Sequence, residues 1–303
     1  MKTKRTTASE YVIGIGELLW DCFPTYRRMG GAPANFAYHA SQFGFDTMVV
    51  SAVGKDTDGD ALLDELKLHH LDSCIERSDL PTGTVMVDTS NPNDPHYNIN
   101  TEVAWSAIHY TQELDVIAKN CCAVCFGTLA QYGSVSRNTI MQLLDNVPQG
   151  CYKVYDINLR ANPGTPLYDD KTVINSISKC NVLKVNIEEL QYLTSLYSLD
   201  EETSVETRSK ALLEKNPNLK LLVVTMGTDG SWVFTGSESS FEETPKIDLV
   251  DAVGAGDSFT GSFIGSLLKG KTIKEAHQLA VKVSAYVCTQ PQGMPAMPRE
   301  LYL

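Results

Sequence analysis

The sequence predicts an α/β fold in which helices cover both faces of a mainly parallel central sheet and a small β-hairpin lies beside it. Short apolar segments alternate along the 303 residues with stretches in which apolar residues recur every three to four positions. This alternation is typical of a parallel sheet between two helical layers. The chain has no linker rich in Gly, Ser or Pro and no internal repeat, which favours one domain over residues 1–303.

Seven segments have the apolar composition of buried strands, and helical periodicity fills most of the intervals between them. Helices are expected over Ala34 to Phe43, over Ala61 to Leu71 and around Ile140 to Leu144. The expected strands are Tyr11 to Ile15, Thr47 to Val53, Ala123 to Phe126, Lys153 to Ile157, Val182 to Val185, Leu221 to Thr225 and Ser231 to Thr235.

The region from Thr82 to Trp105 interrupts the alternation. Its extended segments Thr84 to Asp88 and His96 to Asn100 flank seven turn-forming residues, 89–95, a pattern that predicts a hairpin with a long loop. Residues 20–29 favour a second short extended excursion. Because hairpins that project from an α/β core often close over a site, we expect lid elements at about 20–30 and 82–105.

The charge balance excludes one class of partner. The chain carries 25 Lys+Arg against 37 Asp+Glu, a net charge of -12, and a surface this acidic repels the phosphates of nucleic acid. No apolar run approaches the roughly 18 residues that a membrane span requires, and the basic start of the chain is not followed by an apolar stretch. We therefore expect no nucleic-acid partner, no membrane partner and a cytoplasmic location.

The eight cysteines and six histidines do not predict a metal or redox centre. The pair Cys122 and Cys125 has the C-x-x-C spacing, but residues three apart on a strand are expected on opposite faces of the sheet. A second cysteine pair that would complete a zinc site is missing, as is the H-x-x-x-H spacing. Buried, inert thiols are the favoured interpretation.

Two glycine motifs imitate nucleotide-binding signatures. Residues 265–272 match the phosphate-loop pattern G-x-x-x-x-G-K-T, yet Phe259, Phe263 and Leu267 recur at helical spacing. This places the first glycine of the pattern inside a helix, and Thr272 with Glu275 then has the spacing of a capping box for the next helix. Gly14-Ile-Gly16 lacks the third glycine of a dinucleotide fingerprint.

A better anion site lies upstream, where an extended apolar segment leads through Gly254, Ala255 and Gly256 into the Phe259 helix. Glycines let a ligand approach the backbone, and the N–H groups at a helix start attract an oxyanion. Asp257 falls in the first turn, where its carboxylate could take a proton from a hydroxyl that attacks a phosphoryl group. On the residues alone, a helix-capping role for Asp257 is an equal alternative.

This segment resembles the C-terminal signature D-T-x-G-A-G-D of the ribokinase-type (PfkB) carbohydrate kinases. Ala252 stands where that pattern usually has Thr, which removes a hydroxyl near the anion site but not the carboxylate. The N-terminal signature of the family is present as Gly-Gly-Ala-Pro-Ala-Asn-Phe-Ala at residues 30–37. The resemblance implies a ribokinase-like fold, ATP and a small sugar as substrates, and Asp257 as the base beside an anion hole formed by Gly254, Ala255 and Gly256.

The resemblance also implies the sugar contacts. Asp21, Gly31 and Asn35 match positions that touch the sugar in this family, and the amide of Asn35 could serve vicinal hydroxyls as donor and acceptor. Asp21 is expected just after the first strand, at the sheet edge where α/β proteins bind ligands. Arg160 ends a D-x-N-x-R segment whose arginine approaches the transferred phosphate and the sugar.

Nucleotide and metal positions follow from the same resemblance. The N-x-x-E segment at residues 186–189 is associated with Mg²⁺, which Glu189 would reach through water. A solvated first-turn acid is the alternative for Glu189. A monovalent cation, in some members K⁺, often lies near the positions of Asp251 and Val253. The residues that border the nucleotide by resemblance are Asn186, Glu189, Thr225, Gly227 and Gly230.

Within the family, the segments at residues 16–24, 30–37, 126–130 and 293–296 are most similar to fructokinases. The resemblance therefore implies ATP-dependent phosphorylation of D-fructose at a primary hydroxyl, giving fructose 6-phosphate. A 2-keto-3-deoxygluconate kinase and a ribokinase are the nearest alternatives, and a nucleoside kinase shares the chemistry. A non-catalytic sugar or nucleotide sensor on the same fold is an alternative of another class. Family members commonly form homodimers through the lid.

Overall fold

The computed structural model describes residues 11–88 and 96–302. Its core is a nine-stranded sheet in the order β15-β14-β13-β12-β9-β8-β1-β4-β5. The pairs from β13 to β5 are parallel, and β14 and β15 add an antiparallel edge. The strands are β1 (Tyr11–Ile15), β4 (Asp46–Gly54), β5 (Asp72–Ser78), β8 (Cys121–Phe126), β9 (Tyr152–Asp156), β12 (Val182–Asn186), β13 (Leu221–Thr225), β14 (Ser231–Phe234) and β15 (Ser239–Glu242).

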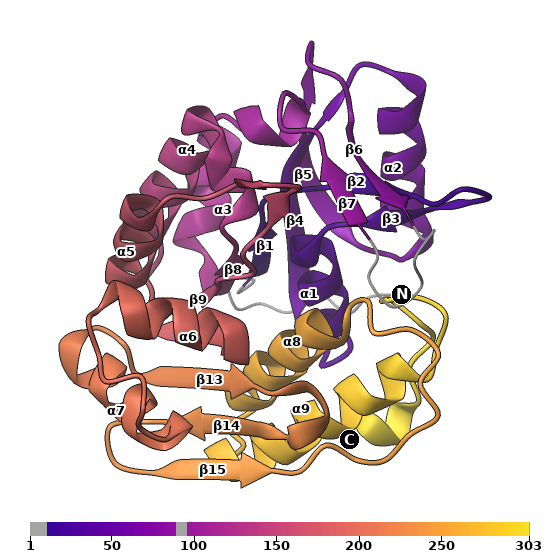
Figure 1. Ribbon diagram of the computed structural model, residues 1–303. Helices are drawn as coiled ribbons and strands as arrows, with labels where there is room; N and C mark the ends of the chain where they lie inside the picture. The colour runs from indigo at the N-terminus through magenta and orange to yellow at the C-terminus, as the bar shows by residue number, and fades with distance from the viewer. Residues whose placement is uncertain (1–10, 89–95, 303) are drawn as a thin grey trace.

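Helices cover both faces of this sheet, as the alternating pattern predicts (Figure 1). Side chains from α3 to α7 join the core of one face, and side chains from α1, α8 and α9 form that of the other. The helices are α1 (Ala32–Ser41), α2 (Thr57–Leu68), α3 (Gln112–Lys119), α4 (Ser134–Asn146), α5 (Asp170–Lys179), α6 (Ile187–Leu196), α7 (Val205–Lys215), α8 (Ala255–Leu268) and α9 (Ile273–Cys288).

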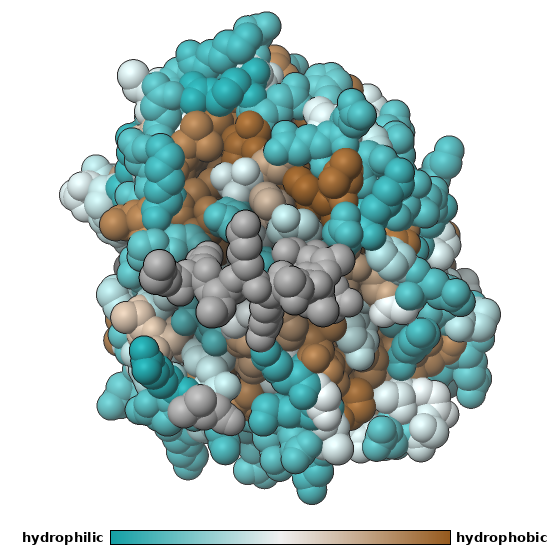
Figure 2. Space-filling model, turned by 180° about the vertical axis from the view of Figure 1, so that it is seen from behind, coloured by the Kyte–Doolittle hydropathy of each residue, from teal (hydrophilic) through white to brown (hydrophobic). Residues whose placement is uncertain are grey.

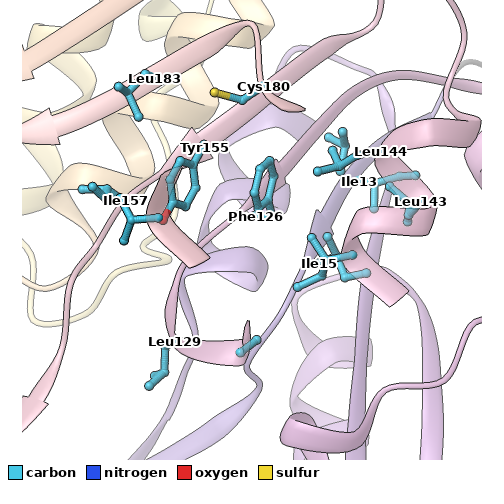
Figure 3. Close-up of a cluster of buried hydrophobic side chains, with 14 of the residues drawn as sticks. Ile13, Ile15, Phe126, Leu129, Leu143, Leu144, Tyr155, Ile157, Cys180 and Leu183 are labelled. Carbon is cyan, nitrogen blue, oxygen red and sulfur yellow. The ribbon is translucent and has the colours of Figure 1, made fainter. Parts of the chain in front are cut away.

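The two cores follow from the two-residue period of the strands. On β1, Ile13 and Ile15 belong to the α3–α7 side, whereas Val12 lies on the α1, α8 and α9 side. Phe126 stacks on Tyr155 in the first core, with ring centroids 5.0 Å apart (Figure 3). Each such fully buried side chain stabilises the fold by roughly 1.5–3 kcal/mol relative to exposure. The predicted fold class is confirmed, and the seven predicted strands are present to within two residues at each end.

A four-stranded sheet in the order β3-β2-β6-β7 lies beside the core. Its strands β6 (Gly83–Asp88) and β7 (His96–Ile99) pair in antiparallel fashion, as the predicted hairpin requires. The second excursion forms β2 (Leu19–Cys22) and β3 (Arg27–Gly30). The loop predicted at residues 89–95 is outside the described residues. We call this the small sheet; the Asn162 side chain ties it to the core by bonding the N–H and C=O of Ile99, at 2.7 and 3.0 Å.

The phosphate-loop pattern at residues 265–272 is a helix, a turn and a second helix, as predicted. Gly265 lies inside α8, where a Cβ would come within 2.6 Å of the Phe43 ring. Gly270 follows the helix with a φ of 81°. Thr272 and Glu275 form both bonds of a capping box at the start of α9. The glycines of this pattern therefore serve helix packing and a turn.

The prediction that Cys122 and Cys125 lie on opposite faces is wrong. The register between β1 and β8 shifts at this point, since Tyr11 pairs with Cys121 and Val12 with Ala123. This bulge turns Cys122 toward the core face that holds Cys125. None of the eight cysteines forms a disulfide, and the described residues contain no group of three His, Cys, Asp or Glu side chains that could hold a metal. Burial raises the pKa of the Cys125 thiol well above its usual range.

The surface seen from behind is largely hydrophilic with separate apolar patches (Figure 2). Among the described residues, no helix is long and apolar enough to cross a membrane.

Candidate active site

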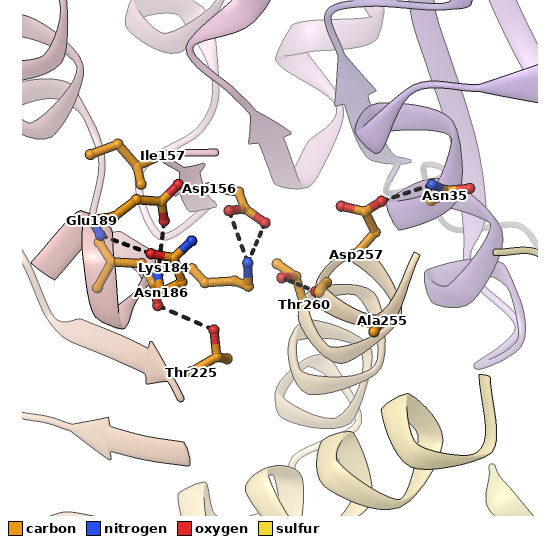
Figure 4. Close-up of polar contacts among 12 residues, drawn as sticks. Asn35, Asp156, Ile157, Lys184, Asn186, Glu189, Thr225, Ala255, Asp257 and Thr260 are labelled. Carbon is orange, nitrogen blue, oxygen red and sulfur yellow. Dashed lines mark hydrogen bonds and ion pairs between the residues drawn. The ribbon is translucent and has the colours of Figure 1, made fainter. Parts of the chain in front are cut away.

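The candidate site lies at the carboxyl ends of the parallel strands, next to β1. From β1 the chain builds the sheet outward through β4 and β5 on one side and through β8, β9, β12 and β13 on the other. Ligands of open α/β sheets bind at such a reversal of strand order. Figure 4 shows the polar side chains that gather there, from Thr225 through Asp156 and Lys184 to Asp257 and Asn35.

The start of α8 is open. Its N-cap, Gly254, has a φ of 78°, and a Cβ there would come within 2.6 Å of the Gly293 backbone. No side chain caps the helix. The N–H of Ala255 bonds to the Ala252 carbonyl at 3.2 Å, whereas the next two N–H groups, of Gly256 and Asp257, have no acceptor within the helix. These two donors and the positive end of the helix dipole suit an oxyanion.

Asp257 does not cap its own helix, so the capping interpretation is wrong. Its Oδ2 accepts a hydrogen bond of 2.7 Å from Asn35 Nδ2 on α1. Burial raises the pKa of Asp257 to about 6, with a further contribution from the nearby Asp156 carboxylate. A carboxylate with this pKa is ionised at neutral pH and is a stronger base than an ordinary aspartate.

Asn35 comes from the start of a second uncapped helix. The N-cap of α1 is Gly31, which has a φ of 126°. It lies so close to Glu17 that a Cβ would come within 2.4 Å of the Glu17 carbonyl. Because one amide N–H of Asn35 serves Asp257, its second N–H and its Oδ1 remain for another partner.

Glu17 is a site residue that the sequence interpretation missed. Its side chain is 4% exposed, and Oε2 has no hydrogen-bond partner among the described residues. Burial raises the pKa of Glu17 to about 7; the nearby Arg160 lowers it and Asp257 raises it. Glu17 comes two residues after β1 ends. Because α/β sheets bind ligands at the carboxyl ends of their strands, this position could have identified Glu17 as a site residue.

Asp21 follows β1 and lies on β2 of the small sheet, within the extended excursion predicted for residues 20–29. Burial raises the pKa of Asp21, and Arg28 and Arg160 oppose that effect. Arg160 itself is exposed and follows the irregular segment after β9. In that segment Asn158 has a φ of 41°, a conformation that Asn tolerates better than most residues. Asp21 and Arg160 are therefore brought to the same side of the site as Glu17.

Lys184 is the second missed residue. Its Nζ lies 3.0 and 2.8 Å from the two carboxylate oxygens of Asp156 on the neighbouring strand, and both side chains are at most 10% exposed. Burial alone would lower the pKa of Lys184, but Asp156 and Glu189 outweigh it and raise the pKa. A Cβ on Gly256 would come within 3.1 Å of Nζ. The ammonium group thus lies directly under the open turn of α8.

Glu189 is buried, at 6% exposure, so the alternative of a solvated acid is wrong. Its Oε1 accepts from the Leu159 N–H and its Oε2 from the Asn186 N–H, both at 2.8 Å. With the reciprocal bond from the Glu189 N–H to Asn186 Oδ1, these contacts form a capping box at α6. Each carboxylate oxygen keeps acceptor capacity for a water, so Glu189 fits a Mg²⁺ ion held mainly by ATP phosphates and water.

The predicted nucleotide residues surround the ends of β12 and β13. Thr225 ends β13 and donates to the Val185 carbonyl at 3.4 Å. Gly227 and Gly230, with φ values of 57° and 101°, shape the turn into β14. Thr244 Oγ1 donates to the Gly227 carbonyl at 2.6 Å. Thr225 lies at the end of the site away from Asp257 (Figure 4).

Asp251 and Val253, the positions predicted for a monovalent cation, contact each other. The Val253 N–H donates to Asp251 Oδ1 at 2.9 Å. The other carboxylate oxygen is paired with the Arg28 guanidinium of the small sheet. A side-chain cation therefore already occupies one oxygen of the predicted cation ligand.

The centre of the site is narrow. A cavity of about 10 Å³, with room for roughly one water molecule, is lined by residues of α1, β8, β9 and α8, among them Asp156 and Asp257, and by Gly127 after β8. A sugar does not fit into this volume, so binding requires access from the open side or a movement of the surrounding elements.

Comparisons with known proteins show which family the chain matches. A family model described as pfkB family carbohydrate kinase matches residues 16–300. An ATP-dependent 6-phosphofructokinase from Thermoanaerobacterium thermosaccharolyticum is 29% identical over 91% of this chain and 87% of its own length. A probable fructokinase-2 from Arabidopsis thaliana is 26% identical over 95% and 93%.

Solved structures share the fold. A fructokinase with bound ATP from Xylella fastidiosa has a TM-score of 0.82 at 18% identity, covering 94% of this chain and 96% of that one. A fructokinase double mutant from Vibrio cholerae O395, with fructose, ADP and potassium ion bound, has a TM-score of 0.79 at 24% identity over 98% and 99%.

Proposed function

The chain belongs to the PfkB family of carbohydrate kinases, and on this premise we propose that it transfers the γ-phosphoryl group of ATP to a primary hydroxyl of D-fructose, giving fructose 6-phosphate. The observation that carries the proposal is the uncapped start of α8, where an ionisable Asp257 stands beside two backbone donors and above Lys184. Base, oxyanion donors and a cation are the parts that phosphoryl transfer needs.

Asp257 acts as the general base in this proposal. It accepts the proton of the sugar hydroxyl as that oxygen attacks the γ-phosphorus, and the bond from Asn35 holds its carboxylate in one orientation. The pKa of about 6 leaves Asp257 ionised at neutral pH yet basic enough to assist the transfer. Asn35 therefore has two roles. It orients Asp257, and its second N–H and its Oδ1 are available to sugar hydroxyls.

The phosphates lie along the open helix start. The N–H groups of Gly256 and Asp257 stabilise the charge of the transferring group, and Lys184 adds a positive charge beneath them. Glu189, beside Asn186, would hold Mg²⁺ through water, and the ion would neutralise phosphate charge when ATP is bound. Arg160, which is exposed, is proposed to contact the phosphoryl group from the sugar side. The nucleotide base extends toward Thr225, Gly227 and Gly230.

The charge of the acceptor side favours a neutral sugar. Glu17, Asp21 and Asp257 each lie near enough to Arg160 for its charge to lower their pKa values. Carboxylates bind hydroxyls well and repel a second phosphate. This favours fructose over fructose 6-phosphate, the acceptor indicated by the name of the Thermoanaerobacterium relative.

The small sheet is proposed as a lid. It carries Asp21, and its movement would admit the sugar and then exclude water, so that ATP is not hydrolysed. Met86 on β6 is 56% exposed, and a homodimer formed through this sheet would cover it.

A panel of acceptors in a coupled ADP-release assay tests the function. D-fructose is compared with fructose 6-phosphate, 2-keto-3-deoxygluconate, D-ribose and adenosine. The Asp257→Asn variant is assayed in parallel to measure background ADP release. We expect kcat/KM for D-fructose to exceed each other value at least about tenfold, a difference of about 1.4 kcal/mol.

The other outcomes are equally informative. A preference for fructose 6-phosphate, another sugar or adenosine would overturn the proposal that D-fructose is the acceptor. It would leave the proposal of kinase chemistry intact. Binding of sugar or ATP without turnover of any acceptor would support a sensor and overturn the catalytic proposal.

A further inference from the structure

An ion pair joins two parts of the chain that flank the site. Arg28 lies on β3 of the small sheet, and its Nη1 contacts Asp251 Oδ2, 223 positions away in sequence. The same nitrogen lies 3.4 Å from the Pro291 carbonyl. The Arg28 and Asp251 side chains are 15% and 23% exposed. The pair is thus largely protected from solvent, where a charge interaction is screened less than on an open surface.

Asp251 belongs to a seam that supports the open start of α8. The N–H groups of Val250 and Asp251 bond to the Cys288 carbonyl, at 2.9 and 3.2 Å. These bonds join the chain before α8 to the C-terminal end of α9. Gly254 also packs closely against Gly293. The seam is this set of contacts of Val250, Asp251 and Gly254 with Cys288 and Gly293. A charge placed on Asp251 therefore acts on the turn that presents the two backbone donors.

The oxygens of this seam are of the kind that alkali cations prefer, namely a carboxylate and backbone carbonyls. A potassium ion is bound in the structure of the Vibrio cholerae fructokinase. In this chain, however, the Arg28 guanidinium already contacts both the Asp251 carboxylate and the Pro291 carbonyl. A second cation on Asp251 would meet a like charge, so these residues do not fit a monovalent ion while Arg28 is in place.

Two further contacts hold the guanidinium there. Its carbon lies 4.8 Å from the centre of the Phe23 ring, a cation–π contact. On the strand itself, Arg28 is the cross-strand partner of Asp21. The guanidinium therefore acts on two carboxylates, one on the sugar side and one on the phosphate side.

We propose that Arg28 is a built-in substitute for a monovalent cation: its charge on Asp251 holds the turn before α8 in the form that binds the phosphoryl group, so the kinase needs no K⁺. Arg28 is a positioning residue in this proposal, because it acts through Asp251 and not on the reacting atoms. The inference rests on the kinase activity of the family and not on the choice of D-fructose as acceptor.

The test compares Arg28→Ala with Arg27→Ala. Arg27 is the neighbouring arginine, paired with Asp58 at 2.5 Å and placed over the Trp20 ring at 4.3 Å, away from Asp251. Turnover with ATP and the best acceptor of the panel is measured in choline, sodium and potassium chloride at equal ionic strength. Wild type and Arg27→Ala are expected to work equally, within about twofold, in all three salts.

Arg28→Ala is expected to lose at least about tenfold in kcat in choline chloride and to recover most of it in potassium chloride or in millimolar guanidinium, because an added cation then binds Asp251. The conservative variant Arg28→Lys should remain independent of K⁺. Without substrates, KCl should raise the thermal midpoint of Arg28→Ala by at least about 2 °C over choline chloride and leave that of the wild type unchanged.

Three results would overturn the proposal. A wild-type enzyme that K⁺ activates tenfold or stabilises would show that Arg28 does not replace the ion. Full activity of Arg28→Ala in choline chloride would show that no cation is needed at Asp251. A loss that neither K⁺ nor guanidinium restores, in a protein that still unfolds cooperatively, would make the pair a structural link only. Because the thermal measurement uses no acceptor, a wrong choice of sugar cannot imitate these results.

Discussion

Helices α8 and α9 start differently, and the difference separates a ligand site from a structural turn. α9 begins at Thr272, the last residue of a sequence that matches a phosphate loop, yet its own side chains bond the N–H groups of Thr272 and Glu275. Thr272 Oγ1 accepts from the Glu275 N–H at 3.3 Å, and Glu275 Oε2 accepts from the Thr272 N–H at 2.9 Å. α8 begins at Gly254 with no side-chain cap. An anion can use only the donors that the helix leaves unpaired.

The same criterion divides the other helices that the structure describes. Side chains cap α2, α3, α5, α6, α7 and α9, whereas α1, α4 and α8 begin at a glycine without a side-chain cap. The start of α4 has different neighbours, since Gly133 packs against the Ser106 carbonyl, where a Cβ would lie at 1.9 Å. The other two, α1 and α8, meet at the site through Asn35 and Asp257. An uncapped glycine start therefore marks the site only where two such starts meet.

Removing the charge of Asp257 should produce the largest effect at the open helix start. In Asp257→Asn, kcat is expected to fall at least about 100-fold because the base is lost, whereas the KM for sugar and the Kd for ATP should change less than about threefold. Steady-state kinetics and calorimetric ATP binding measure these quantities. Turnover near that of the wild type would show that Asp257 is not the base.

The pH profile and the stability of the variant provide the controls. Since burial raises the pKa of Asp257 to about 6, kcat/KM of the wild type should fall about tenfold per unit below pH 6, and this limb should be absent in the variant. Ionisation of a carboxyl whose pKa is raised on folding destabilises the folded state at pH 7. The variant should therefore unfold at the same or a higher temperature, and a lower one would attribute the kinetic loss to misfolding.

Gly254 and Gly270 allow the turns before α8 and α9 to be compared directly. Both have a left-handed backbone, with φ values of 78° and 81°, but a Cβ meets the Gly293 backbone at 2.6 Å only at Gly254. Gly254→Ala should lower kcat/KM for ATP at least about tenfold, since strain of about 1–2 kcal/mol and the collision displace the open turn. Gly270→Ala should cost about 1 kcal/mol of stability without changing activity.

Kinetics and urea unfolding of the two variants, measured side by side, decide this prediction. Equal kinetic losses would mean that the effect comes from backbone strain in general. An unaffected Gly254→Ala enzyme would show that the shape of the turn before α8 does not matter for phosphate binding.

The pattern of the sequence was sufficient for the parts of the fold that local rules determine. β1 and β13 were predicted with their observed bounds, and the capping box of α9 was recognised from Thr272 and Glu275. β5 was missed because its residues are exposed or only partly buried, so it lacks the apolar run of a central strand. Its pairing with β4 holds it in the sheet. Local hydrophobicity thus predicts central strands better than edge strands.

The site was predicted where motifs lie on single segments and missed where contacts join distant ones. Lys184 lies in an apolar strand, and only its pairing with Asp156 across two parallel strands reveals its position under α8. Arg28 and Asp251 are 223 residues apart. The bulge at Cys122 depends on the register with β1. Such contacts arise when distant segments pair in the folded chain. Local patterns in the sequence do not show which segments pair.

The smallest effect is expected at the capped start of α9. It tests whether this helix start has only a structural role. Thr272→Ala removes the cap and should lower the free energy of unfolding by about 1 kcal/mol, with kcat/KM unchanged within about twofold. The matched variant is Asn186→Ala in the capping box of α6, which borders the proposed phosphate path. It should cost similar stability and also weaken the use of ATP. Urea unfolding and ATP kinetics of both variants provide the check. A folded Thr272→Ala enzyme with a tenfold lower kcat/KM would return residues 265–272 to consideration as a phosphate loop, because only ligand binding could then link that exposed cap to catalysis.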